Sequence, residues 1–363
     1  EVTALTLDMS AAGAATFNST INGVGISSNI TNFSQSILIS NDAGTGTLST
    51  ASNNTGLGFE VFDDLTSGDD NTAVGMQALT KLTTGSQNIA MGSIAGDALT
   101  EGSNNTAYGY GALSTDTLGS KNTAIGSAAL FAQNFTTATN SYNTAVGDSA
   151  GAAVTTGTDN TLIGGLAGDA ITTGSGCTIV GKGAGSAITT GGDNTGIGKQ
   201  ALENTTTGTS NTAVGKDALD ANTTASNNTA VGFKSLEANT TGDKNTAIGG
   251  LALDANTTGT ANVAVGYGAL SDNTTSNNNT AVGYNAMTDT TAADNTAVGQ
   301  SALKVNTTGG NNTAVGSNAL ITNTTGGLNT AVGSSALEMN TTGEKNVAMG
   351  YEALEENTTA TGN

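Results

Sequence analysis

The stretch "NTAVGKDALDANTTASNNTAVGFKSLEANTTGDKNTAIGG", residues 211–250, begins the same unit three times. The Gly that ends each Asn-Thr-Ala-Val-Gly unit serves below as the reference Gly, and eighteen such units occur in the chain. Fifteen of the seventeen intervals between reference glycines are 17 residues long; one is 21 (Gly126 to Gly147) and one is 16 (Gly283 to Gly299). A fixed period this short indicates a solenoid, in which each repeat forms one coil and stacks on the next.

Short strands joined by tight turns fit this repeat, because 17 residues rich in Gly and β-branched residues cannot form a helical hairpin. The sequence therefore predicts an all-β chain, a parallel β-solenoid (β-roll) of about eighteen 17-residue coils. Residues 1–50 differ, since residues 4–21 and 36–50 each read as strand, Gly-containing turn and strand. We expect a β-hairpin cap or connector at residues 1–50, covering the open edge of the first coil, and a solenoid repeat domain at residues 51–363.

Position −4 from the reference Gly holds Asn in seventeen of the eighteen coils, and the exception is Cys177. Each side chain of a stacked β-coil lies about 4.8 Å above its equivalent in the coil below. A column that tolerates Asn alone is expected to be a ladder of amides hydrogen-bonded from coil to coil. Cys177 fits a buried slot as a small, weakly polar side chain. We assign this structural ladder to Asn71, Asn88, Asn105, Asn122, Asn143, Asn160, Asn194, Asn211, Asn228, Asn245, Asn262, Asn279, Asn295, Asn312, Asn329 and Asn346.

Two further columns vary together. Position +4 is most often Leu and position +7 is typically Asn, but in four coils Gly replaces the Leu and an apolar residue replaces the Asn. These pairs are Gly96 with Leu99, Gly151 with Val154, Gly168 with Ile171, and Gly185 with Ile188. Losing a large apolar side chain leaves a cavity, which the residue at +7 is expected to fill. The variable Asn at +7, such as Asn239, is expected to contribute less to stability than the Asn at −4.

The strand Thr-Ala-Val places adjacent apolar residues on opposite faces. A strand that is apolar on both faces is buried on both faces. One face lines the coil, and the other needs a partner that no second apolar layer of this sequence supplies. We therefore expect the partner to be another copy of the same chain.

The charge balance excludes several classes of function. The chain has 29 acidic residues against nine basic ones, all Lys, and its formal net charge is −20. Without a basic stripe, we expect no binding to nucleic acid and none to anionic membrane surfaces. No apolar run is long enough to span a bilayer, so we expect no membrane insertion. The absence of His and the lack of paired carboxylates on a groove argue against an enzyme and against any catalytic residue.

Asn-Thr-Ala-Val-Gly-x-x-Ala-Leu units linked by Asn-Thr-Thr-Gly resemble the repeats of bacteriophage tail fibres. They are equally similar to the head repeats of trimeric autotransporter adhesins, whose heads are left-handed parallel β-rolls. The resemblance covers residues 54–360 and recurs in every coil. It implies a homotrimer and a location outside the cell or on a virion.

The four-residue insertion in "LFAQNFTTATNSYN", residues 130–143, is the first candidate binding site. It carries Phe131, Phe135 and Tyr142, and aromatic side chains on a protruding loop suit contact with a receptor or sugar. Alternatively, the aromatics tuck back onto the coil.

A column of acidic residues at position +5 is the second candidate. Glu203, Asp220, Glu237 and Asp254 occupy it in four consecutive coils. Carboxylates stacked one coil apart repel one another, so they are either solvated or share a cation such as Ca²⁺. No other metal site or cofactor is expected.

Together these features favour a structural fibre or adhesin that presents a host- or surface-binding face, as in a phage tail-fibre segment. Its partners would be copies of itself and a cell-surface glycan or protein receptor. A bacterial trimeric adhesin head and a self-assembling extracellular filament subunit are the alternatives. Ice binding is disfavoured, because Thr at positions +8 and +9 point opposite ways and leave one outward Thr file.

Overall fold

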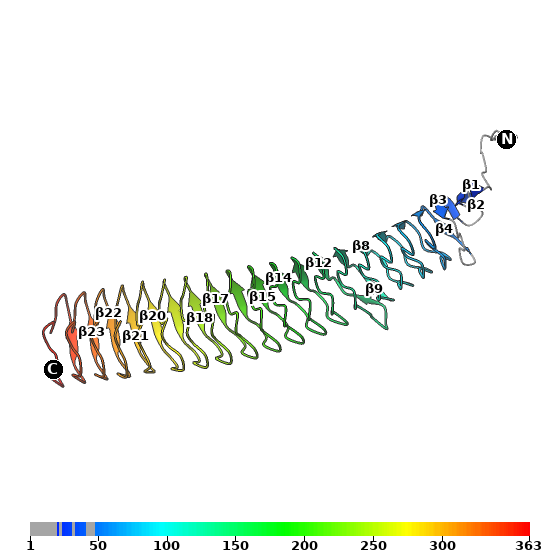
Figure 1. Cartoon of the computed structure of the whole chain (residues 1–363). Helices are drawn as coiled ribbons and strands as arrows, with labels where there is room; N and C mark the ends of the chain where they lie inside the picture. Colours follow the sequence, from blue (N-terminus) through cyan, green and yellow to red (C-terminus); the bar gives the residue numbers. More distant parts are fainter. Residues whose placement is uncertain (1–19, 22–23, 31–32, 41–47) are drawn as a thin grey trace. The chain divides into compact units, whose positions relative to one another are not determined.

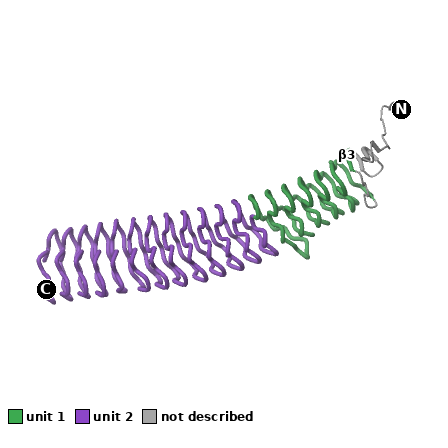
Figure 2. Tube along the Cα trace, viewed as in Figure 1, with its two compact units in different colours: residues 1–149 green, residues 150–363 purple. Residues whose placement is uncertain are grey.

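The computed structural model describes residues 20–21, 24–30, 33–40 and 48–363. Within these residues the chain is built of short strands, turns and bends without a helix, and the strands follow one another at the repeat spacing (Figure 1). The expected fold, a parallel β-solenoid of about eighteen turns, is confirmed. The chain divides into two compact units, unit 1 at residues 1–149 and unit 2 at residues 150–363 (Figure 2).

Unit 1 contains an antiparallel segment followed by parallel coils. Strand β2 pairs antiparallel with β1 and β3, and β3 pairs in parallel with β4 and β5. The repeat strands β5, β6, β7, β8, β10 and β12 pair in that order, in parallel and in register, while β9 pairs with β11. The bounds are β1 Thr20–Ile21, β2 Val24–Ile30, β3 Phe33–Ser40, β4 Ala51–Ser52, β5 Thr55–Leu57, β6 Thr72–Val74, β7 Ile89–Met91, β8 Thr106–Tyr108, β9 Gly119–Ser120, β10 Thr123–Ile125, β11 Thr139–Asn140 and β12 Thr144–Val146.

Unit 2 consists of repeat strands alone, each paired in parallel with the next. The register joins residues 17 apart, as in Thr212 with Thr229, except between β20 and β21, where it joins residues 16 apart. The bounds are β13 Thr161–Ile163, β14 Thr178–Val180, β15 Thr195–Ile197, β16 Thr212–Val214, β17 Thr229–Val231, β18 Thr246–Ile248, β19 Val263–Val265, β20 Thr280–Val282, β21 Thr296–Val298, β22 Thr313–Val315, β23 Thr330–Val332 and β24 Val347–Met349.

The N-terminal strands cover the edge of the first coil, through the pairing of β3 with β5. The hairpin expected at residues 4–21 lies almost wholly outside the described residues. Of the hairpin expected at residues 36–50, the first half belongs to β3, but residues 48–50 form no strand. The partner of β3 is β2 instead, because the seven-residue strand Val24–Ile30 offers a longer antiparallel ladder.

Each repeat strand is three residues long because the reference Gly ends it. Gly75 has a φ of +137°, and a Cβ there would lie 2.3 Å from the carbonyl oxygen of Gly92 in the next coil. Neither the backbone angle nor the close approach is open to a residue with a side chain. The Gly column therefore sets the point where the chain bends away from the sheet and where adjacent coils touch.

The coil interior is filled by small and aliphatic side chains. Ala73, Ala78 and Leu79, at positions −2, +3 and +4 of one coil, are fully buried. In the coils with Gly at +4, a Cβ at Gly168 would lie only 2.7 Å from Cδ1 of Ile171. The residue at +7 thus occupies the space of the missing Leu, and the expected compensation is confirmed.

Asn at position −4 connects both neighbouring coils and closes its own. The Oδ1 of Asn88 accepts the backbone N–H of Asn105 at 3.0 Å, and the Nδ2 of Asn88 donates to the carbonyl of Gly102 at 2.9 Å. The same pair of bonds recurs in most coils of the column, whose Asn residues are at most 1% exposed. The Nδ2 of Asn143 donates to Gln133 instead, and the buried Nδ2 of Asn228 has no hydrogen-bond partner among the described residues. Cys177 keeps a weaker version, with its N–H donated to Asn160 and its Sγ 3.4 Å from the carbonyl oxygen of Gly191.

Position +7 carries a second buried ladder. Asn256 donates from Nδ2 to Oδ1 of Asn239 at 2.8 Å, and Asn239 donates to the carbonyl of Gly242 at 3.1 Å. Both Asn side chains are fully buried. The amides at position +7 are thus as buried as those at position −4, which favours similar contributions to stability over the smaller contribution expected from the sequence.

A third ladder is formed by Thr at position +8. The Oγ1 of Thr206 donates to the carbonyl of Thr223 at 3.0 Å, and Thr240 donates to Thr257 in the same way. Three columns of polar side chains thus satisfy backbone groups in the turns, which the three-residue strands cannot reach.

We predict that Asn239→Ala and Asn245→Ala each lower the free energy of unfolding by about 1–3 kcal/mol, because each leaves buried partners unsatisfied. Chemical denaturation followed by circular dichroism measures this loss. The matched control is Asn204→Ala, at an exposed position +6, which should cost no more than about 0.5 kcal/mol. Asn239→Ala behaving like Asn204→Ala would contradict a second structural ladder.

Candidate functional site

The insertion in unit 1 does not gather its aromatic side chains into one patch. Phe135 is 6% exposed and packs into the coil, as the tuck-back alternative describes. Phe131 and Tyr142 are 43% and 51% exposed, and no ring contact joins them among the described residues. The Nζ of Lys121 donates to Oη of Tyr142 at 2.9 Å and lies 4.9 Å from its ring centroid, which holds this ring in place.

A buried polar network anchors the insertion. Asp116, fully buried, accepts the backbone N–H groups of Gly119 and Phe135 and the Nε2–H of Gln133 at 2.7 Å. Gln133 accepts in turn from Nδ2 of Asn143 at 2.8 Å. Burial raises the pKa of Asp116, while its hydrogen bonds oppose that rise. Asp116 and Gln133 both occupy position +7, where the three preceding coils have Leu and the next has Val, so two polar residues in an otherwise apolar stretch of the column were the sequence signal for this network.

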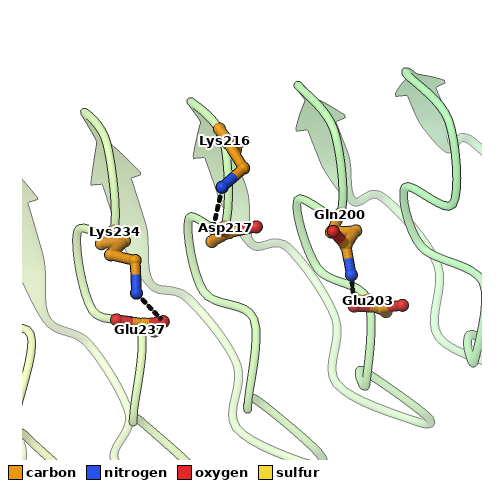
Figure 3. A network of polar contacts seen from close by, with 6 residues as sticks. All are labelled: Gln200, Glu203, Lys216, Asp217, Lys234 and Glu237. Atoms are coloured by element: carbon orange, nitrogen blue, oxygen red, sulfur yellow. Dashed lines mark hydrogen bonds and ion pairs between the residues drawn. The ribbon is translucent and has the colours of Figure 1, made fainter.

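The acidic column at position +5 lies in unit 2. Figure 3 shows that Glu203 and Glu237 each have a partner in their own coil. Gln200 donates from Nε2 to Glu203 at 2.6 Å, and Lys234 pairs with Glu237 at 2.8 Å. The described residues contain no group of three or more Asp, Glu, Cys or His side chains placed to hold one metal ion. The arrangement therefore favours solvated and locally paired carboxylates over the shared Ca²⁺.

Asp220 is the member of this column under most electrostatic stress. Partial burial, the charge of Glu203 and a hydrogen bond with Glu203 raise the pKa of Asp220 to about 6, with smaller contributions from Asp217 and Glu237. Burial also raises the pKa of Asp254, one carboxylate oxygen of which has no hydrogen-bond partner in the protein. The column therefore takes up a proton at mildly acidic pH.

A column of Lys residues lies beside the acids and was missed in the sequence. Lys182, Lys199 and Lys216 occupy position +1 in three consecutive coils, and all three are exposed. Lys216 pairs with Asp217 at 3.0 Å (Figure 3). Its Nζ also lies 5.5 Å from the ring centroid of Phe233, the next residue of the column. Three Lys residues at a spacing of 17 in a chain with nine were the available signal.

Two of these Lys residues border a shallow groove of about 300 Å³, which we name the lysine groove. Its lining residues are Leu166, Lys182, Gly183, Ser186, Lys199, Gln200 and Glu203. Among the described residues, no carboxylate lies within 4.0 Å of Lys182 or Lys199. The groove therefore presents two ammonium groups, one carboxylate and neutral hydrogen-bonding side chains.

The outward strand face exposes apolar side chains at a regular spacing. In each strand the central residue is buried, whereas the flanking residues at positions −3 and −1 are at least partly exposed. Position −1 is Val, Ile or Met in most coils. Exposure reaches 37–53% at Met91, Tyr108, Ile125, Ile163, Ile197 and Ile248.

No protein-family model matches the sequence, and no curated protein is significantly similar to it. The resemblance of the repeats to tail fibres and adhesin heads therefore remains a prediction. The part of the chain that the structure describes holds no helix able to cross a bilayer.

We predict that Asp220→Asn raises the melting temperature by a few degrees at pH 7.5 and has a smaller effect at pH 4. An Asp whose pKa is raised on folding binds more protons in the folded state, so stability falls as pH rises from about 4 to about 6. The substitution removes that cost. Thermal unfolding at both pH values, with the exposed Asp294→Asn as a control for the charge change, measures it. Equal shifts in the two variants at pH 7.5 would refute the coupling to Glu203.

Proposed function

We propose that the chain is a structural segment of an extracellular fibre, of the phage tail-fibre kind, that presents a host- or surface-binding face. The observation that carries the proposal is the outward strand face. Each coil already fills its interior, yet position −1 leaves an aliphatic or aromatic side chain at least partly exposed in every repeat, beside a Thr at position −3 in most of them. Regular exposure of apolar side chains does not stabilise a monomeric coil, so it favours a partner that buries them.

The partner that fits this surface is a second and third copy of the chain. We expect an apolar stripe repeated over so many coils to exceed the few hundred Å² that soluble monomers usually expose. Closed cyclic symmetry buries such a stripe without leaving it open to further association. The three-fold order follows from the resemblance to trimeric fibres and adhesin heads, so the proposed assembly is a homotrimer.

The receptor would be a cell-surface glycan or protein. Exposed aromatic side chains at Phe131 and Tyr142 and the lysine groove are the surfaces available for it. A net charge of −20 disfavours nucleic acid and anionic membranes as partners. We propose no enzymatic activity, since the acidic residues stack on one another and the sequence has no His.

The head of a bacterial trimeric surface adhesin is the second candidate, favoured by the same repeats and the same apolar face. Ice binding finds no support, because the Thr hydroxyls at position +8 are donated to carbonyl groups of the next coil. Electron microscopy separates free fibres from filaments that grow end to end, the third possibility.

We predict that light scattering on the purified protein returns about three times the chain mass of 35.3 kDa. The double substitution Val231→Asp and Val265→Asp, on the outward face, should yield monomers, because it would bury charge at the contact. Thr241→Asp, at an exposed position +9, adds charge elsewhere and should leave the trimer intact. A stable monomer of the unmodified chain at micromolar concentration would overturn both the partner-facing assignment and the proposed fibre.

A further inference from the structure

Four of the nine basic residues of this acidic chain lie between residues 182 and 234. We propose that the lysine groove binds an acidic saccharide, with its anionic groups on Lys182 and Lys199. This inference rests on the proposed function and names the ligand class of one presented surface.

The two ammonium groups are free to bind an anion. Among the described residues neither has a carboxylate within 4.0 Å, whereas Lys216 is paired with Asp217. The acid of the groove, Glu203, accepts a hydrogen bond from Gln200 and is therefore held by a neutral side chain. With two Lys and one Glu, the lining carries one net positive charge, in a chain whose overall charge is −20.

The spacing of the Lys residues suits a repeating polymer. Equivalent side chains of consecutive coils are about 4.8 Å apart, comparable with the rise of one ring in an extended saccharide. Lys216 continues the column, and the half-exposed ring of Phe233 follows it, with Lys216 and Lys234 within 6 Å of the ring centroid. An anionic chain lying along the column would meet ammonium groups first and then an aromatic surface.

The surroundings of the groove favour a saccharide over an acidic peptide. Extended peptides commonly add to a free sheet edge, but β14 and β15 beside the groove are paired on both sides. Ser186 and Gln200 supply neutral hydrogen-bonding groups, and the groove is open and shallow, as hydroxyl-rich ligands require. Charge-assisted bonds from Lys to carboxylate or sulfate would provide most of the affinity.

Calorimetric titration of the assembled protein at low salt tests the site. The probes are trigalacturonate, a sulfated chondroitin tetrasaccharide, uncharged maltotriose and triglutamate. We expect at least one acidic saccharide to bind and maltotriose not to, and the carboxylated and sulfated probes identify the preferred anion. The double substitution Lys182→Gln and Lys199→Gln should weaken this binding at least about tenfold. Added salt should weaken it as well.

The matched control is Lys304→Gln with Lys345→Gln, which removes two positive charges elsewhere in unit 2. It should bind like the unmodified protein. Equal loss in both double variants, no binding of either acidic saccharide, or equal binding of triglutamate would overturn the proposal. Light scattering on the same samples distinguishes the two proposals. A trimer that does not bind acidic saccharides would refute the saccharide site, whereas a monomer would refute the proposed trimeric fibre.

Discussion

The hydrogen bond from the backbone N–H of one Asn to the side-chain oxygen of the Asn one coil earlier is the interaction on which this solenoid depends. With three residues of strand in a coil of 17, most backbone groups lie in turns, where backbone bonds between coils satisfy many of them but the N–H at position −4 is satisfied by a side chain. A short amide can accept from the neighbouring coil and donate across its own. Asn245 does both, at 2.9 Å to the N–H of Asn262 and at 2.8 Å to the carbonyl of Gly259. Neither Asp nor Leu offers a donor and an acceptor in so small a side chain.

The need to bond turn N–H groups to adjacent coils also explains why several non-glycine residues have a strained, left-handed backbone. In one coil Ser210, Asp217 and Leu219 all have φ between 51° and 57°, a left-handed conformation that costs non-glycine residues on the order of 1–3 kcal/mol each. Each of the three turns its N–H toward an adjacent coil, where it is bonded to Gly192, Lys199 and Ser235 respectively. The strain is therefore offset by bonds between coils, and a single isolated coil would retain the cost without the compensation. Stacking is a condition of this fold, as in other repeat proteins.

The fold could be predicted because several columns are nearly invariant, among them Asn at −4, Ala at +3 and the reference Gly. Their spacing gives the length of a coil, and their uniform residue type indicates that they are buried or closely packed. The ladder at position +7 was missed for the opposite reason. Asn222, Leu99, Asp116 and Gln133 all fill that slot, and a column of mixed chemistry does not look structural. The full network around Asp116 needed three-dimensional information, since two of its three partners lie 17 and 19 residues away. The Lys column was readable from the spacing alone, but a few charges stand out poorly among 363 residues.

In a solenoid, residues one period apart in the sequence lie in a row along the structure. The position within the repeat therefore determines whether a residue faces the interior or can contact a ligand. Inward columns are constrained by ladders and by volume, so recognition falls to the outward positions, which the coil leaves free to vary. Position +1 changes in order from Lys182, Lys199 and Lys216 to Phe233, and Tyr267 and Tyr284 later in the same column stack with their centroids 5.9 Å apart. Charged and aromatic groups thus follow one another along one line of unit 2. A ligand that extends over several coils would contact these side chains one after another, so its binding would depend on their order. A ligand confined to a single coil would contact only one of them.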